Sequence, residues 1–271
     1  MNILATLDRN YIHYLNVMLF SLRQAEPDAQ LDVYILHSGL EERDMEPSRR
    51  ILGERGCVTL VRVSEEGLAG APVTDRYPRE IYYRIFAAKY LPDTLDRALY
   101  LDPDIVVNRS LRALYEMPMG TAYFAAASHI GNLLHFFNEL RLDMDGVSPY
   151  INSGVMLMNL HRLRAEQDMQ AVFEYMRAHR GKLLLPDQDI ISALYGDRII
   201  PLDAVRYNMT ERLFALHRES GDRMDIDYVR NNSHIIHYCG RNKPWKSGYV
   251  GRLDTFYRAA ESALRAELPD A

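Results

Sequence analysis

Along the first half of the chain, short continuous apolar runs alternate with segments in which apolar residues recur at helical spacing. Short apolar runs such as residues 2–7 and 31–38 have the length and composition of buried strands. Between them, Tyr11, Leu15 and Met18 recur at the spacing of one helix face. The pattern predicts strands at 2–7, 31–38, 58–63, 98–101, 104–108, 122–128 and 154–160. It predicts helices over 11–22, 41–55, 79–90, 162–178 and 187–195, and a C-terminal helix with Leu253, Phe256, Tyr257, Ala260 and Leu264 facing inward.

The order of these elements indicates an α/β fold. Strands that alternate with helices form mainly parallel sheets, because each crossover helix brings the chain back to the end of the sheet at which the previous strand began. We therefore expect one Rossmann-like domain, residues 1–271, with a mainly parallel central sheet flanked by helices on both faces. A chain of 271 residues with 48% hydrophobic and 25% charged residues can bury such a core.

Charge and cysteine content exclude several classes of protein. The net charge of −5, without a block of like charge, is not typical of a nucleic-acid-binding surface. Two cysteines, Cys57 and Cys239, suit a reducing compartment better than a disulfide framework. Residues 1–30 do not resemble a secretory signal, and no apolar run reaches the roughly 18 residues of a membrane span. We expect a cytoplasmic protein, either free or peripheral at the inner membrane face.

Two aspartates stand at the end of a predicted strand in the stretch ALYLDPDIVV, residues 98–107. Asp102 and Asp104 flank Pro103, whose fixed φ makes the turn between them rigid. Two carboxylates at one strand end can converge on a hard divalent cation such as Mn²⁺ or Mg²⁺. The alternative is a surface turn in which both aspartates are solvated or cap a neighbour.

Asp8 follows the first predicted strand, so in a parallel sheet it lies at the same rim as Asp102. Taken on its own, its position favours a cap of the helix that begins near Tyr11. The chain has no G-x-G-x-x-G and no P-loop lysine motif, so a glycine cradle for phosphate is not expected. A diphosphate would need another source of positive charge.

The stretch HYCGRNKPW, residues 237–245, offers such a charge. A neutral His237 can be a third metal ligand, although such a histidine taken by itself is more often a packed or hydrogen-bonded structural residue. Gly240 allows a close approach of the backbone to a phosphate, and Lys243 can act as a point charge on it.

Two further stretches place polar residues next to apolar runs. Asn152 and Ser153 stand directly before the predicted strand at 154–160, where they could bind a hydroxyl-rich ligand or simply form a turn. In LPDQDII, residues 185–191, Asp187 has the position of a helix cap, with Gln188 and Asp189 as solvated residues of the first turn.

Taken together, these stretches resemble glycosyltransferase family 8, the retaining GT-A enzymes that include lipopolysaccharide galactosyltransferases and the glycogenins. Six segments carry the resemblance in the family's order and span nearly the whole chain. They are LDRNY (7–11), YYRIFAAKYLP (82–92), ALYLDPDIVV (98–107), YINSGVMLMNL (150–160), LPDQDII (185–191) and HYCGRNKPW (237–245).

The resemblance implies a GT-A fold and transfer of galactose or glucose from a UDP-sugar to a saccharide acceptor such as a glycolipid, polysaccharide or glycoprotein. It implies Mn²⁺, with Mg²⁺ as the alternative, ligated by Asp102, Asp104 and His237. The implied donor contacts are Asp8, Asn10 and Tyr11 for the nucleoside, Gly240 and Lys243 for the diphosphate, and Arg84, Asn152, Ser153, Asp187 and Gln188 for the sugar.

Asp187 and Gln188 are the implied catalytic residues. Gln188 has the position that the family places beneath the anomeric carbon, and an amide is a poor nucleophile. We therefore favour attack by the acceptor on the face that the leaving group departs from. The family's galactosyltransferases have an acceptor-binding aspartate near the position of His129, so a lactose-type acceptor is not expected. The alternatives are a catalytically silent sugar-nucleotide-binding module and a phosphohydrolase that uses Asp-x-Asp.

Overall fold

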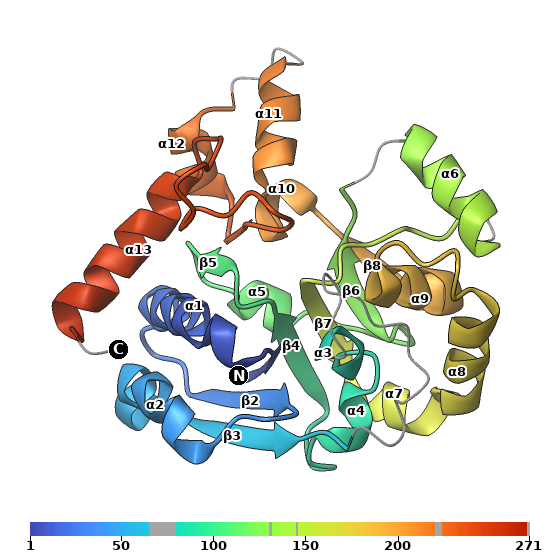
Figure 1. The fold of residues 1–271 in the computed structure, drawn as a ribbon, viewed down its shortest axis with the longest axis horizontal. Helices are drawn as coiled ribbons and strands as arrows, with labels where there is room; N and C mark the ends of the chain where they lie inside the picture. Colours follow the sequence, from blue (N-terminus) through green and yellow to red (C-terminus); the bar gives the residue numbers. More distant parts are fainter. Residues whose placement is uncertain (65–79, 130–131, 145, 220–223, 270–271) are drawn as a thin grey trace.

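A seven-stranded sheet forms the centre of the protein. The computed structural model describes residues 1–64, 80–129, 132–144, 146–219 and 224–269. The strand order of the central sheet is β3-β2-β1-β4-β7-β6-β8 (Figure 1). The strands are β1 (Asn2–Thr6), β2 (Leu31–His37), β3 (Gly56–Arg62), β4 (Arg97–Leu101), β6 (Phe124–Ala127), β7 (Val155–Asn159) and β8 (Ile199–Leu202). Only β7 is antiparallel to its neighbours among these strands, so the expected mainly parallel sheet is confirmed.

The reversed direction of β7 determines where polar residues meet. Because β7 runs opposite to β4, the residues before β7 lie at the edge where β4 ends. The backbone N–H of Asp102, after β4, donates to the carbonyl of Gly154, before β7, at 2.8 Å. Polar residues that are about 50 positions apart in the sequence therefore share one rim of the sheet, which is the usual ligand edge of such folds.

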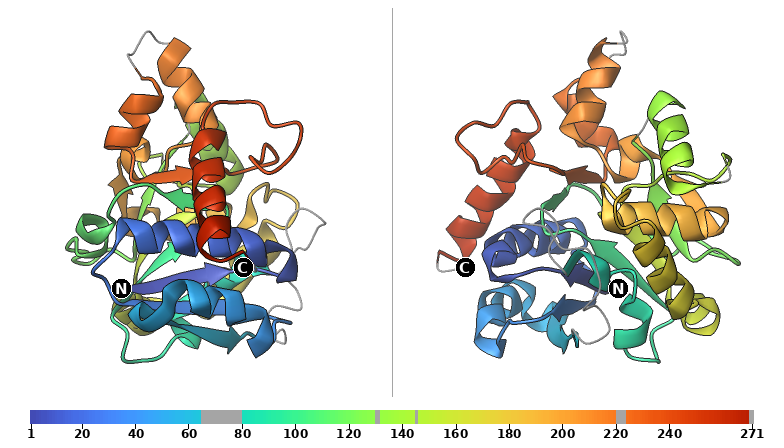
Figure 2. Two further views of the ribbon diagram at one scale, coloured as in Figure 1. Left: turned by 90° about the vertical axis from the view of Figure 1, so that its left-hand side faces the viewer. Right: turned by 45° about the vertical axis from the view of Figure 1, so that its right-hand side comes forward.

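Helices cover both faces of the sheet (Figure 2), and this explains the almost continuous apolar strands. Neighbouring residues of β1 point to opposite faces: Ile3 packs into a core with α1 (Ile12–Ala25) and α13 (Asp254–Glu267), and Leu4 into a second core. The remaining helices are α2 (Glu46–Leu52), α3 (Glu80–Tyr83), α4 (Ala87–Tyr90), α5 (Arg112–Tyr115), α6 (Asn132–Leu142), α7 (Leu160–Glu166), α8 (Met169–Ala178), α9 (Pro186–Tyr195), α10 (Ala204–Tyr207), α11 (Glu211–Glu219) and α12 (Ile226–Asn232). Short 3₁₀ helices are η1 (Arg9–Tyr11), η2 (Glu42–Met45), η3 (Gly53–Arg55) and η5 (Gly196–Arg198).

A second, two-stranded sheet brings the C-terminal part of the chain to the Asp-Pro-Asp turn. Strand β5 (Ile105–Val107) pairs antiparallel with β9 (Ile235–His237), and Ile105 lies opposite His237. The strand predicted at 104–108 is thus confirmed, but it belongs to this small sheet rather than to the central one. None of the helices in the described ranges has both the length and the apolar character of a bilayer span.

The single helix predicted over 79–90 is wrong for its described residues, 80–90. Helix α3 ends at Tyr83 and α4 begins at Ala87. The residues between them form tight turns, in which Ile85 N–H donates to the Tyr82 carbonyl at 3.0 Å. This break turns Arg84 inward, and the residue is only 6% exposed. The helix predicted over 162–178 is also interrupted, since Asp168 caps the start of α8.

Candidate active site

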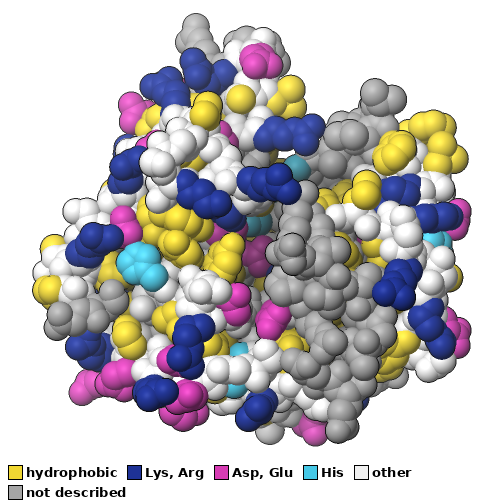
Figure 3. Space-filling view, viewed as in Figure 1, with side chains coloured by type: hydrophobic (Ala, Val, Ile, Leu, Met, Phe, Trp, Pro, Cys, Tyr) yellow, Lys and Arg dark blue, Asp and Glu magenta, His cyan; other side chains and the backbone are white. Residues whose placement is uncertain are grey.

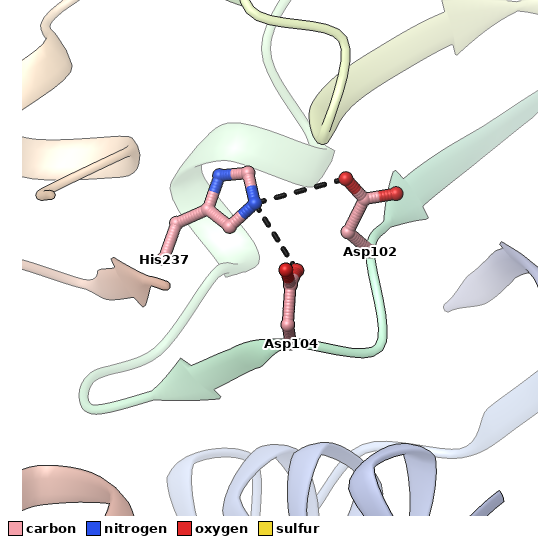
Figure 4. Close-up of side chains that lie close together, drawn as sticks. All are labelled: Asp102, Asp104 and His237. Atoms are coloured by element: carbon pink, nitrogen blue, oxygen red, sulfur yellow. Dashed lines mark ion pairs between the residues drawn. The ribbon is translucent and has the colours of Figure 1, made fainter. Parts of the chain in front are cut away.

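Asp102, Asp104 and His237 converge on one point between the two sheets (Figure 4), and we call them the Asp–His cluster. The Nε2 atom of His237 lies 3.2 Å from Asp104 Oδ1 and 3.7 Å from Asp102 Oδ2. One ligand atom from each residue lies within 4.8 Å of the others. The structure therefore brings together the three residues that the sequence predicted as metal ligands.

Two buried polar atoms of the cluster have no hydrogen-bond partner among the described residues. They are His237 Nε2 and Asp104 Oδ1, which face each other at 3.2 Å but make no hydrogen bond, and the His237 side chain is only 1% exposed. The other ring nitrogen, Nδ1, lies 2.8 Å from Asn208 Oδ1. Unpartnered buried polar atoms are costly, and a divalent cation between these atoms would satisfy both. Two carboxylates and a neutral imidazole suit Mn²⁺.

Gly154 packs against the Asp–His cluster, and the absence of a side chain leaves room for His237 and Asp102. It was not among the site residues predicted from the sequence. A Cβ atom at this position would lie 2.3 Å from His237 Cε1 and 2.6 Å from Asp102 Oδ2. Both distances are far shorter than van der Waals contact. Any side chain at position 154 would therefore displace a residue of the Asp–His cluster.

Arg84 links the cluster to the start of α9. Its Nη1 lies 3.1 Å from Asp102 Oδ1 and 3.2 Å from Asp187 Oδ2. Burial alone lowers the pKa of the Arg84 guanidinium, but the carboxylates, Asp102 foremost, reverse this effect and raise the pKa. Burial raises the pKa of the Asp187 carboxyl, and Arg84 offsets this shift only in part. Arg84 thus stays charged between two carboxylates.

Lys243 neutralises the other carboxylate of the cluster. Its ammonium donates to Asp104 Oδ2 and, at 2.8 Å, to the carbonyl of Tyr238, and the residue is 7% exposed. Burial raises the pKa of Asp104, but Lys243 and His237 outweigh it and hold the pKa well below the usual range. Gly240, in the same loop, has a φ of +83°, which favours glycine.

A cleft of about 610 Å³ opens over these residues, and a second hollow of about 290 Å³ shares Tyr11, Arg84, Asp102 and Asp104 with it. Acidic side chains lie near the middle of this face, below a row of Lys and Arg side chains (Figure 3). The basic residues that line the cleft include Arg212, Arg241, Lys243 and Lys246. The charge needed for a diphosphate is therefore present.

Two of the three residues expected to bind the nucleoside line the smaller hollow. Asp8 accepts a hydrogen bond from Asn10 N–H at 2.8 Å and so caps the 3₁₀ helix η1, which leads into α1; the N-cap of α1 itself is Tyr11. Asp8 and Tyr11 line the smaller hollow, whereas Asn10 is exposed. Burial raises the pKa of the Tyr11 hydroxyl.

The residues expected at the donor sugar form one hydrogen-bonded group. Ser153 Oγ donates to Asp187 Oδ2 at 2.7 Å, and Asn152 Nδ2 donates to Gln188 Oε1 at 3.0 Å. Helix α9 has Leu185 as its N-cap, so the prediction of Asp187 as a cap is wrong. The side chain of Asp187 is instead only 10% exposed and faces Arg84.

The prediction that Asp189 is solvated is also wrong, since its side chain is fully buried. Asp189 accepts hydrogen bonds from Arg141 and Tyr150, and from the backbone N–H groups of Leu184 and Leu185. The Arg141–Asp189 ion pair therefore links α6 to α9, and the two backbone contacts tie α9 to the residues just before it. Sequence spacing could not reveal it, because Arg141 and Asp189 are 48 positions apart.

His129 lies beside the cluster. Its Nε2 donates to the Asn208 carbonyl at 2.7 Å. Burial, with a smaller contribution from His237, lowers the pKa of His129 to about 4. The imidazole is therefore neutral at physiological pH.

Comparison with known proteins gives consistent matches across the chain. The model of a family described as glycosyl transferase family 8 matches residues 2–248. A lipopolysaccharide 1,2-glucosyltransferase of Escherichia coli (strain K12) is 24% identical over 96% of this chain and 77% of its own length. A lipopolysaccharide 1,3-galactosyltransferase of Salmonella typhimurium is 25% identical over 96% and 77%.

Among solved structures, the galactosyltransferase LgtC in complex with donor and acceptor sugar analogues superimposes with a TM-score of 0.83. It is 24% identical, and the match covers 97% of this chain and 96% of LgtC. This likeness confirms the GT-A fold expected from the sequence.

Proposed function

Because this chain belongs to glycosyltransferase family 8, we propose that it transfers galactose or glucose from a UDP-sugar to a saccharide acceptor, with retention of anomeric configuration. The chain would act as one catalytic domain. The relatives named above act on lipopolysaccharide, which supports a glycolipid, a polysaccharide or another glycan as the acceptor. The two free cysteines are consistent with action in the cytoplasm, where the protein could lie at the inner membrane face.

The observation that carries this proposal is the pair of unpartnered atoms, His237 Nε2 and Asp104 Oδ1. Together with Asp102 they would hold Mn²⁺, or Mg²⁺ as the alternative. The cation would supply positive charge to the leaving diphosphate. Lys243 would add its ammonium to the same phosphates, and Gly240 would let the backbone approach them.

Residues at the two ends of the cleft would orient the donor. Tyr11 would stack on the uracil, with Asp8 and Asn10 at the ribose and base. Asp187 would accept hydrogen bonds from sugar hydroxyls, and Arg84 and Ser153 already hold its carboxylate in position. A negative charge there also favours the oxocarbenium-like character that the sugar develops.

The contacts of Gln188 favour attack on the same face over a covalent intermediate. An amide is a poor nucleophile, and the Oε1 atom of Gln188 already accepts a hydrogen bond from Asn152. In this mechanism the acceptor hydroxyl attacks from the side of the departing diphosphate, and a diphosphate oxygen takes its proton. Gln188 and Asn152 position the sugar for this attack.

A panel of UDP-sugars tests the proposal without knowledge of the acceptor. We expect slow, Mn²⁺-dependent release of UDP from UDP-galactose or UDP-glucose, abolished by EDTA. Asp104→Asn removes a proposed ligand and should abolish this turnover. Asp93→Asn, at a side chain that is 97% exposed, should leave it intact.

Two outcomes contradict the proposal. Turnover that is indifferent to EDTA and to Asp104→Asn would remove the metal from the mechanism. Tight binding of UDP and Mn²⁺ with no turnover of any UDP-sugar, with or without glycan acceptors, would instead identify a catalytically silent binding module. With an acceptor in hand, the anomeric configuration of the product is read directly by NMR.

A further inference from the structure

We propose that Asn208 is a positioning residue that sets the tautomer of His237 and, through Asn152, the orientation of the Gln188 amide. This inference rests on the proposed function, because it takes His237 as a metal ligand and Gln188 as a residue of the sugar site. Asn208 was not among the site residues predicted from the sequence.

The backbone around Asn208 is fixed next to β9. Asn208 ends α10 and is fully buried. The following residue, Met209, donates its N–H to the Ile235 carbonyl at 3.0 Å and accepts from His237 N–H at 2.8 Å. The side chain of Asn208 is therefore held beside the imidazole by the main chain and does not depend on a flexible loop.

A single backbone N–H defines the direction of the hydrogen bonds in this group. Gly154 N–H can only donate, and it lies 3.1 Å from one side-chain atom of Asn152, which must therefore be the oxygen Oδ1. The Asn208 atom 3.0 Å from that oxygen must then be the donor Nδ2. The amide orientations of both asparagines follow from this one donor.

The same reasoning reaches His237. Since Asn208 Nδ2 faces Asn152, its Oδ1 faces His237 Nδ1 at 2.8 Å and must accept a hydrogen bond. In the neutral ring the proton is therefore on Nδ1, and Nε2 carries the lone pair directed at Asp104. This is the tautomer that a metal ligand needs, and a partner on the other ring nitrogen is how proteins fix it.

The other amide group of Asn152 extends the chain of hydrogen bonds to the sugar site. Its Nδ2 donates to Gln188 Oε1 at 3.0 Å. One group of hydrogen bonds, oriented by the Gly154 N–H, thus connects the proposed metal ligand with the proposed catalytic amide. Loss of the Asn208 side chain should therefore disturb both His237 and the Gln188 amide. Loss of its Nδ2 donor alone should disturb only the Gln188 amide.

Two variants separate these effects. Asn208→Asp keeps an oxygen for His237 but replaces the donor to Asn152 with an acceptor. We expect Mn²⁺ affinity, measured by EPR of free Mn²⁺ without nucleotide, to be no weaker than in the wild type, because the oxygen that faces His237 is kept and a negative charge is added. The kcat for UDP-sugar hydrolysis should be at least about tenfold lower. Asn208→Ala removes both contacts and should weaken Mn²⁺ binding about 10- to 100-fold.

Asn159→Ala is the matched structural control. Asn159 also bridges two elements, since its Nδ2 donates to the Ala122 carbonyl and its Oδ1 caps α7. This variant should lower the melting temperature without a change in Mn²⁺ affinity. Wild-type Mn²⁺ affinity in Asn208→Ala, or equal weakening by both Asn208 variants, would overturn the proposal.

A readout that needs neither metal nor turnover separates this inference from the proposed function. The ¹⁵N chemical shifts of His237 in the metal-free wild type should report a proton on Nδ1, where Asn208 Oδ1 accepts its hydrogen bond. In Asn208→Ala the Nδ1 position should lose this fixed proton. A wild-type ring with no proton on Nδ1 would refute the role of Asn208, whatever reaction the protein catalyses.

Discussion

Replacement of Lys243 by methionine changes the charge at Asp104 without removal of a proposed metal ligand. In the structure the Lys243 ammonium lies on Asp104 Oδ2, the carboxylate that would also bind the cation. Metal binding without nucleotide therefore has to compete with this ion pair. Once a donor is bound, the same ammonium is expected to move to the diphosphate. The two binding steps should respond to the substitution in opposite directions.

The expected size of both effects follows from the contact itself. A hydrogen bond to a charged group is worth about 1.5–3 kcal/mol, and about 1.4 kcal/mol corresponds to a factor of ten. Lys243→Met should therefore tighten the binding of Mn²⁺ alone by roughly tenfold or more. It should weaken the binding of UDP in saturating Mn²⁺ by a similar factor, because the phosphate loses its cationic partner.

Folding stability provides a second readout of the same contact. Removal of one partner of a buried ion pair typically costs about 3–5 kcal/mol, since the other charge stays buried. Lys243→Met without metal should accordingly be less stable than the wild type, and Mn²⁺ should restore more stability to the variant than to the wild type.

Calorimetric titrations of Mn²⁺, and of UDP in saturating Mn²⁺, measure the two affinities. Lys246→Met is the control, because Lys246 is an exposed lysine that lines the same cleft. It reports the effect of one positive charge without a contact to Asp104. Unchanged or weaker binding of Mn²⁺ alone by Lys243→Met, relative to this control, would refute the competition between lysine and metal.

Three further substitutions test other parts of the structure. Gly154→Ala should weaken Mn²⁺ binding by more than about tenfold with the fold retained, because its Cβ would collide with His237 and Asp102. Gly39→Ala is the control, since the space around its Cβ is open, and should leave Mn²⁺ affinity unchanged. The pKa of His129 is about 4 in the folded protein and 6.5 in the unfolded chain. Between these two pH values the imidazole is neutral in the folded protein, whereas the unfolded chain binds a proton there. The free energy of unfolding of the wild type should therefore fall by up to about 3 kcal/mol as the pH drops from 6.5 to 4. Urea titrations of His129→Gln over this pH range should show a smaller fall. The same dependence of stability on pH in both proteins would contradict the burial of a neutral ring. Arg141→Met leaves the Asp189 carboxylate buried without its cation and should cost about 3–5 kcal/mol in denaturant titrations, whereas Arg265→Met, at a 65% exposed side chain, should cost less than about 1 kcal/mol.

The central sheet could be predicted because its signal is local. Residues 2–7 and 31–38 are almost continuously apolar, since both faces of the sheet are covered, and such runs are recognisable without knowledge of their partners. The Asp-Pro-Asp turn was found for the same reason, since strand end, proline and both carboxylates lie within a few positions.

The rest of the site depends on pairings between distant segments. Residues 235–237 were not predicted as a strand, although His237 was a candidate ligand, and their pairing with β5 is what places His237 opposite Ile105. The break between α3 and α4 directs the Arg84 guanidinium to Asp102 and Asp187, and the helical spacing of the neighbouring residues does not reveal these distant partners. Asn208 had no signal at all, because its role depends on hydrogen bonds to residues 29 and 56 positions away.

The central claim, that Asp102, Asp104 and His237 hold one divalent cation at the diphosphate, is tested most directly by anomalous X-ray scattering. Crystals would be soaked with MnCl₂ and UDP, and data collected on both sides of the manganese absorption edge. We expect one manganese peak within about 2.3 Å of a ligand atom from each of the three residues and in contact with the UDP phosphates, with Lys243 moved from Asp104 to the phosphate. Bound UDP without a manganese peak between these side chains, or a peak held by other residues, would contradict the claim.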